Sequence, residues 1–223
     1  MNEYKLSKSE VLNYLGYKKQ SMTGDLDLLI DESMSECLAV ATPRYTKGFF
    51  DITVDNDTVI LKNTNVIFKS SDIAFHLNGA AKCVLFAATL GSETEHMLIK
   101  YEKTNMTKAV IFDAACNALI ESASDSFEEE IAAELAKSSL YINYRFSPGY
   151  GNFSIGNERN IIDLLSAEIR IGLTLNDSSL LIPQKSITAV IGVFNSPKSH
   201  EIGCRYCKNY NICNQKGGAD CAV

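Results

Sequence analysis

An excess of basic residues is missing from this sequence of 223 residues. It has 21 Lys and Arg against 27 Asp and Glu, which gives a formal net charge of -6. Surfaces that bind nucleic acids or anionic membranes need clustered positive charge. We therefore expect no nucleic-acid partner and no membrane partner.

Long apolar runs are also missing. The longest stretches without a charged residue, such as Ser186 to Pro197, fall far short of the roughly 20 residues that a membrane-spanning helix needs. The first five residues include an acid and lead into no apolar segment, so we expect no signal peptide. These features predict a cytoplasmic protein.

The glycine-rich motifs of nucleotide-binding proteins do not occur. The sequence has no G-x-G-x-x-G and no P-loop, so the usual dinucleotide and nucleoside-triphosphate sites are excluded, and it has no internal repeat. Apolar residues make up 46% of the chain and charged residues 22%. That balance is typical of a globular protein with a substantial core and excludes general disorder.

Hydrophobic periodicity predicts both helices and strands. Helical spacing occurs over 7–16, 25–41, 92–101, 105–137 and 158–169, and strand patterns occur over 49–54, 58–61, 66–68, 83–91, 180–182 and 187–194. Asp55-Asn56-Asp57 predicts a hairpin turn between the first two strands, and Ser70-Ser71-Asp72 predicts the cap of a short helix that ends near Asn78-Gly79. Ser7 and Glu10 have the spacing of a capping box, and Ile169 is counted on the apolar face of the 158–169 helix. The 83–91 run is apolar throughout, which indicates a central, buried strand.

The order of these segments indicates the fold class. Strands and helices do not alternate regularly, which disfavours a doubly wound parallel sheet. We predict an α+β fold, with helices packed on a mixed, mostly antiparallel sheet. Residues 1–197 would form one domain, whose first 45 or so residues are helical, and residues 198–223 a cysteine-rich C-terminal tail.

Four of the seven cysteines, Cys204, Cys207, Cys213 and Cys221, lie close together near the C-terminus. A disulfide framework would be spread over the chain, so this clustering points to a metal. Four thiolates suit either a structural zinc or an iron–sulfur cluster, and the latter could relay an electron. A tail of free thiols is the alternative, because only one C-x-x-C is present.

The loop from Arg145 to Gly151 carries several groups suited to a ligand. Arg145 offers a planar fork for a carboxylate, Gly149 permits close backbone approach, and Tyr150 can stack and hydrogen-bond. Glu121, among small apolar residues of the 105–137 helix, could face a cationic group. The alternatives are a surface turn with an exposed Arg and a solvated helix face.

Three segments together resemble the activation domain of cobalamin-dependent methionine synthase. They are the 83–91 run, the helix containing Leu119-Ile120-Glu121, and Arg145-Phe146-Ser147-Pro148-Gly149-Tyr150. The resemblance spans roughly residues 80 to 195, and in that family an Arg-x-x-Pro-Gly-Tyr loop binds S-adenosylmethionine.

The resemblance implies a set of ligand contacts. Arg145 would hold the carboxylate of S-adenosylmethionine, and Glu121 would face its cationic end. The backbone around Ser147 would bond the adenine or ribose, and Gly149 and Tyr150 would complete the contact. After Tyr150 the sequence departs from the family, because Gly151-Asn152-Phe153 replaces the usual proline-containing run.

The resemblance also implies partners. The chain is too short to hold the catalytic modules of methionine synthase, so it would reactivate a separate, corrinoid-bearing methionine synthase. An electron from a flavodoxin-type donor and a methyl group from S-adenosylmethionine would convert that partner's cob(II)alamin to methylcobalamin. The alternative is a non-enzymatic metal or electron-carrier protein that contacts a corrinoid or redox partner through its cysteine tail.

Overall fold

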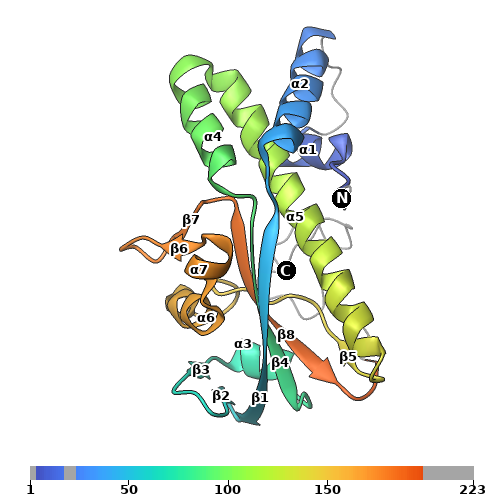
Figure 1. The fold of residues 1–223 in the computed structure, drawn as a ribbon, viewed down its shortest axis with the longest axis vertical. Helices are drawn as coiled ribbons and strands as arrows, with labels where there is room; N and C mark the ends of the chain where they lie inside the picture. The colour runs from blue at the N-terminus through green and yellow to red at the C-terminus, as the bar shows by residue number, and fades with distance from the viewer. Residues whose placement is uncertain (1–3, 18–23, 198–223) are drawn as a thin grey trace. The chain divides into compact units, whose positions relative to one another are not determined.

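The computed structural model describes residues 4–17 and 24–197, which Figure 1 draws in colour. The strands are β1 (Arg44–Asp55), β2 (Thr58–Leu61), β3 (Ile67–Lys69), β4 (Lys82–Thr89), β5 (Tyr141–Ile142), β6 (Thr174–Leu175), β7 (Leu181–Ile182) and β8 (Ser186–Phe194). The helices are α1 (Lys8–Tyr14), α2 (Gly24–Val40), α3 (Ser71–His76), α4 (Ser92–Thr104), α5 (Met106–Ala136), α6 (Glu158–Leu165), α7 (Ala167–Ile171) and the 3-10 turn η1 (Ile155–Asn157).

The strands form a six-stranded sheet in the order β3-β2-β1-β4-β8-β5 and a small pair, β6-β7. The pairs β1–β2, β2–β3, β5–β8 and β6–β7 are antiparallel. The predicted α+β class with a mostly antiparallel sheet is confirmed, and β4 is central because it has a neighbour on each side. The predicted cysteine tail lies outside the described residues.

The chain divides into two compact units. The first comprises Met1–Thr46, Ala87–Ile131 and Ile162–Ile187, and the second comprises Lys47–Phe86, Ala132–Ile161 and Thr188–Val223. Each unit therefore draws on three separate stretches of the chain. Each is described by itself below.

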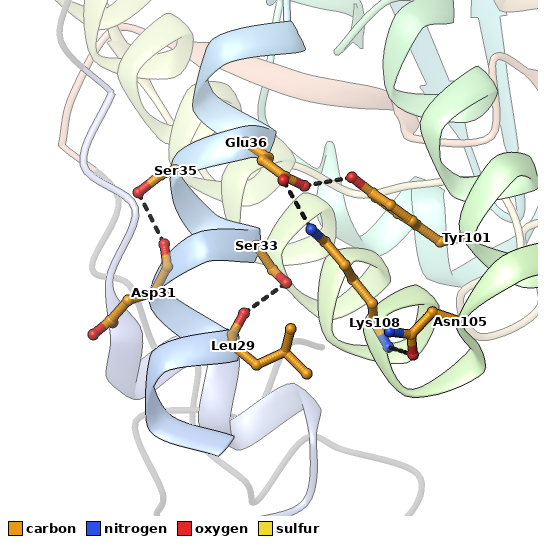
Figure 2. A network of polar contacts seen from close by, with 8 residues as sticks. All are labelled: Leu29, Asp31, Ser33, Ser35, Glu36, Tyr101, Asn105 and Lys108. Atoms are coloured by element: carbon orange, nitrogen blue, oxygen red, sulfur yellow. Dashed lines mark hydrogen bonds and ion pairs between the residues drawn. The ribbon is translucent and has the colours of Figure 1, made fainter. Parts of the chain in front are cut away.

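The first unit contains α1, α2, α4 and most of α5, the long helix coloured from green to yellow in Figure 1. Figure 2 shows how Glu36 of α2 bonds to both neighbouring helices: it accepts from Tyr101 Oη of α4 at 2.5 Å and from Lys108 Nζ of α5 at 2.8 Å. Partial burial raises the pKa of Glu36, but the bonds from Lys108 and Tyr101 outweigh it, so the pKa lies below its ordinary value. The triad holds the three helices in register.

The helix α5 forms the core of the first unit. Its Phe112, Leu119 and Ile131 are at most 1% exposed. Lys185, just before β8, bonds to Asp113 Oδ1 at 2.6 Å and to Asn117 Oδ1 at 2.7 Å on this helix, so the charge of this half-buried side chain is paired. As predicted, α5 is the longest of the described helices. Within the described residues, no helix has both the length and the apolar character that crossing a bilayer requires.

The second unit is built on the β1–β2 hairpin and the short helix α3. The hairpin turns at Asn56, whose φ of 48° is in the left-handed region that Asn tolerates. Ser70 caps α3, accepting a bond from Ile73 N at 3.1 Å, as the sequence predicts. Phe68 and Phe153 pack edge-to-face with centroids 5.2 Å apart and are nearly inaccessible to solvent, so they lie in the core.

Two local predictions are wrong. The expected single helix over 158–169 is broken into α6 and α7 at Ser166, whose φ is 50°, and the break leaves Ile169 89% exposed instead of on the apolar face. The expected capping box at Ser7 and Glu10 does not form. The Ser7 hydroxyl contacts Ser9 Oγ at 2.6 Å instead, and it caps no backbone N–H of α1.

Candidate functional site

The ligand loop predicted at Arg145–Tyr150 lies in the second unit, at the end of a segment that runs beside β8. Phe146 and Val190 exchange both backbone hydrogen bonds, at 3.0 and 2.9 Å. Arg145 is half-buried and precedes this anchor directly. Its backbone is therefore held against a buried strand of the main sheet.

The loop beyond Phe146 is a compact series of turns. Tyr150 N donates to Ser147 O at 3.2 Å, Phe153 N to Tyr150 O at 2.9 Å, and Gly149 N to Phe153 O at 2.7 Å. Gly149 has φ +97°, and a Cβ there would meet no atom within 4 Å. The conformation therefore requires glycine, and the space beside Gly149 is open.

The apolar side of the loop lies in the core. Phe146 is 8% exposed and Phe153 is 1% exposed, and their rings pack with centroids 6.2 Å apart. Tyr150, in edge contact with Phe146 at 6.2 Å, is 42% exposed. The loop thus presents one aromatic ring to solvent on a rigid base. Ser147, whose carbonyl accepts from Tyr150 N, is half-buried.

Glu121, the fifth predicted ligand contact, lies on α5 in the first unit. It is half-buried, next to Ile120, which is 5% exposed, and near the fully buried Ala123. A purely solvated helix face does not describe this position. The other four predicted contacts belong to the second unit, so a shared role with Glu121 stays a prediction.

The predicted metal ligands Cys204, Cys207, Cys213 and Cys221 lie outside the described residues. Among the residues described, no group of three or more His, Cys, Asp or Glu is arranged to hold a metal ion. The three other cysteines are buried and unbridged, and Cys37 Sγ lies 3.4 Å from Cys116 Sγ. Burial raises the pKa of Cys83 to about 12. The pKa of Cys116 is also raised, mainly by its contact with Cys37 and, to a smaller extent, by burial. All three are core side chains, and the raised pKa values leave Cys83 and Cys116 with little thiolate character.

Sequence reasoning missed the contacts that fix the ends of the loop. Asn152 N donates to Asp72 Oδ2 at 2.8 Å, and Asn152 Nδ2 donates to Ser71 Oγ at 2.7 Å, both at the start of α3. These partners are about 80 positions away in the chain, so no local pattern connects them.

A second contact involves the other end of α3. Asn143 Nδ2 donates to the carbonyl of His76 at 2.8 Å, and Asn143 Oδ1 accepts from Gly192 N at 2.6 Å. The His76 ring packs on Tyr144 and Phe146, with centroids 4.7 and 5.1 Å apart. Burial lowers the pKa of His76 to about 4, against the opposing effect of the backbone of Val190 and Tyr144. The imidazole is therefore neutral at physiological pH.

Glu158, the first residue of α6, is a buried acid that sequence reasoning also missed. It is 6% exposed and accepts a hydrogen bond from the hydroxyl of Thr188 on β8. Burial raises the pKa of Glu158 to about 7, and the Thr188 bond only partly offsets this. Glu158 precedes the buried Ile161 and Ile162 by three and four positions, and that helical spacing could have identified it as a core residue.

Comparison with known proteins agrees with the sequence resemblance. No curated protein matches the chain. Among solved structures, the crystal structure of the MetH reactivation domain bound to AdoHcy is similar, with a TM-score of 0.64 and 14% identity over 86% of this chain and 75% of that one. At that identity the likeness establishes the fold. A family model described as "Vitamin B12 dependent methionine synthase, activation domain" matches residues 64–215, well over half of the chain. The chain therefore belongs to the family of vitamin B12 dependent methionine synthase activation domains.

Proposed function

We propose that this protein binds S-adenosylmethionine through the Arg145–Tyr150 loop and supports the reductive methylation of cobalamin. The single observation that carries the proposal is the loop itself. It places a half-buried Arg, an open side at a glycine and an exposed Tyr ring within six residues, on a base anchored to β8.

Each group of S-adenosylmethionine has a suitable counterpart. The guanidinium of Arg145 would bind the ligand carboxylate through two parallel bonds. The backbone around Ser147 would bond the adenine or ribose, and the open side of Gly149 leaves room for the ligand. Tyr150 would stack on a flat part of the ligand. The backbone N–H groups of Gly149 and Tyr150 already donate to carbonyls of this segment, so other groups would donate hydrogen bonds to the ligand.

Family membership supports the ligand. The structurally similar MetH reactivation domain was crystallised with AdoHcy, S-adenosylhomocysteine, the product of methyl transfer from S-adenosylmethionine. Glu121 would face the ammonium or sulfonium end of the ligand, because a half-buried carboxylate favours a cationic neighbour.

In the proposed reaction, the substrate is the cob(II)alamin of a separate, corrinoid-bearing methionine synthase in the cytoplasm. One electron from a flavodoxin-type donor reduces it, and the methyl group of S-adenosylmethionine is transferred to the cobalt. The products are methylcobalamin and S-adenosylhomocysteine. This protein would contribute by holding the methyl donor in a fixed orientation.

Calorimetric titration with S-adenosylhomocysteine tests the proposal. Arg145→Ala removes a charge-assisted, two-point contact and should cost about 1.5–3 kcal/mol of binding, roughly a tenfold to hundredfold rise in Kd. Arg145→Lys keeps the charge but not the planar guanidinium, so its Kd should lie between those of wild type and Arg145→Ala. Arg159→Ala, which removes an exposed arginine of the same unit, is the matched control and should leave Kd unchanged.

A truncated ligand assigns the contact to the carboxylate. 5′-Methylthioadenosine lacks the amino-acid portion, so wild type and Arg145→Ala should bind it equally. Glu121→Gln should likewise weaken S-adenosylmethionine and spare the truncated ligand. No binding by the wild type, or an Arg145→Ala penalty that persists with methylthioadenosine, would overturn the assignment.

We also propose that Cys204, Cys207, Cys213 and Cys221 bind one metal centre, for which an iron–sulfur cluster suits a reaction that consumes an electron better than zinc does. The family match ends at residue 215 and so includes three of these four cysteines. Anaerobic purification, metal analysis and an absorption spectrum test this. Brown protein with acid-labile sulfide would support the cluster, and colourless protein with one zinc would support a structural site. Metal-free protein with four titratable tail thiols would refute the metal centre.

A further inference from the structure

The C-terminal end of the proposed ligand loop is bonded to the start of α3 in both directions. Asn152 N donates to Asp72 Oδ2 at 2.8 Å, and Asp72 N donates to Asn152 Oδ1 at 3.2 Å. Asn152 Nδ2 also donates to Ser71 Oγ at 2.7 Å. Backbone and side chain of each residue are thus used to join two segments that are distant in sequence.

The backbone of the loop also lies unusually close to Asp72. Gly151 has φ +54°, and a Cβ at this position would lie 2.0 Å from Asp72 Oδ2. Real Cβ atoms do not approach other heavy atoms so closely, so the contact requires glycine. The absence of a side chain at Gly151 therefore allows Asp72 to come close enough to bond to Asn152.

The N-terminal end of the loop is bonded to the other end of α3. His76 is the last residue of that helix, and its carbonyl accepts from Asn143 Nδ2 at 2.8 Å. Residues 145–150 therefore lie between two contacts with the same six-residue helix. Neither contact uses a residue assigned to the ligand.

We propose that Asp72 and Asn152 are positioning residues, which hold the Arg145–Tyr150 loop on α3 in the conformation that binds S-adenosylmethionine. The inference rests on the proposed function for the identity of the ligand. Its physical basis is conformational entropy. The segment from Arg145 to Asn152 contains Gly149 and Gly151 and therefore loses much backbone freedom when it becomes ordered. If the segment is ordered before binding, this entropy loss does not reduce the affinity for the ligand.

Three variants and one control test the role. Asp72→Ala removes the acceptor of the Asn152 N–H, whereas Asp72→Asn keeps a carbonyl oxygen at the same reach. Gly151→Ala displaces Asp72 without removing it. Asp55→Ala removes an exposed acid from the hairpin turn of the same unit, so it matches the charge change of Asp72→Ala away from the loop.

Two measurements separate this inference from the proposed function. Hydrogen exchange of a peptide covering 145–153 in the ligand-free protein needs no ligand, and it should be faster in Asp72→Ala and Gly151→Ala than in wild type. Calorimetry with S-adenosylhomocysteine should show about fivefold to tenfold weaker binding for the same two variants, the equivalent of one lost hydrogen bond. Asp72→Asn and Asp55→Ala should resemble wild type in both measurements.

The outcomes are distinct. Faster exchange with weaker binding, restored by Asp72→Asn, supports the positioning role. Unchanged exchange, or faster exchange with unchanged affinity, overturns it even if wild type binds the ligand tightly. Wild-type protein that binds no S-adenosylhomocysteine refutes the proposed function, and with it a role of α3 in binding that ligand.

Discussion

Replacement of the buried acid Glu158 by glutamine should stabilise the protein in a manner that depends on pH. Glu158 is 6% exposed, and Thr188, which donates to it, is 1% exposed. Burial raises the pKa of Glu158 from 4.5 to about 7 in the folded state. Glutamine keeps a carbonyl oxygen that accepts the Thr188 bond, has nearly the same shape and carries no charge.

The sign of the effect follows from proton binding. Between the unfolded pKa near 4.5 and the folded pKa near 7, the unfolded chain releases the Glu158 proton and the folded chain keeps it. The unfolded state therefore gains more from a rise in pH, and the free energy of unfolding falls. The full loss is about 3 kcal/mol, since each pKa unit is worth about 1.4 kcal/mol.

Urea unfolding of wild type and Glu158→Gln at several pH values is the assay. The variant should match wild type at about pH 4.5 and exceed it by up to about 3 kcal/mol at about pH 8. Glu102→Gln, which neutralises an exposed acid on α4, is the control and should show no such trend. A difference between Glu158→Gln and wild type that does not change with pH would refute the conclusion that burial raises the pKa of this carboxyl.

Further predictions concern the two cores. Burial lowers the pKa of His76 from 6.5 to about 4, so on acidification the unfolded state takes up this proton before the folded state does. The free energy of unfolding should therefore fall as the pH drops from about 6.5 to about 4. NMR of the imidazole ring should show neutral His76 at about pH 5 in the folded protein. Phe112→Ala should cost about 3–5 kcal/mol in urea unfolding, since Phe112 is fully buried. Phe75→Ala should cost less than about 1 kcal/mol, because Phe75 is 72% exposed.

The sequence predicts the elements whose causes are local. The β1–β2 hairpin forms around Asn56, α3 begins after the Ser70 cap, and α5 extends over nearly the expected residues. In each case the signal lies within a few positions of the element it specifies, either as a turn residue, a capping side chain or an apolar period.

Predictions fail where a local sequence pattern does not determine the backbone or its long-range contacts. The helix expected over 158–169 breaks at Ser166, although the apolar spacing continues through it, and so Ile169 becomes exposed. Periodicity shows which residues could share a face, but not whether the backbone continues. The side-chain amide contacts of Asn143 and Asn152 join segments 49 to 82 positions apart, and no local sequence pattern predicts them.

The candidate site shows the same division. Arg145, Gly149 and Tyr150 are predicted as ligand contacts because they occur together in one short turn and match the Arg-x-x-Pro-Gly-Tyr loop of the family that the sequence resembles. No such pattern points to Asp72, because its bond with Asn152 forms only where α3 meets the loop. Side chains that contact a ligand are chosen for their own chemistry, whereas those that support them are chosen for where the fold brings them.

A crystal structure of this protein with S-adenosylhomocysteine would show directly whether the ligand binds at the proposed loop. We predict a ligand on the Arg145–Tyr150 loop, with its carboxylate within hydrogen-bonding distance of the Arg145 guanidinium and its body beside Gly149. A ligand bound elsewhere on the protein, or bound on this loop with its carboxylate turned away from Arg145, would contradict the proposed binding site.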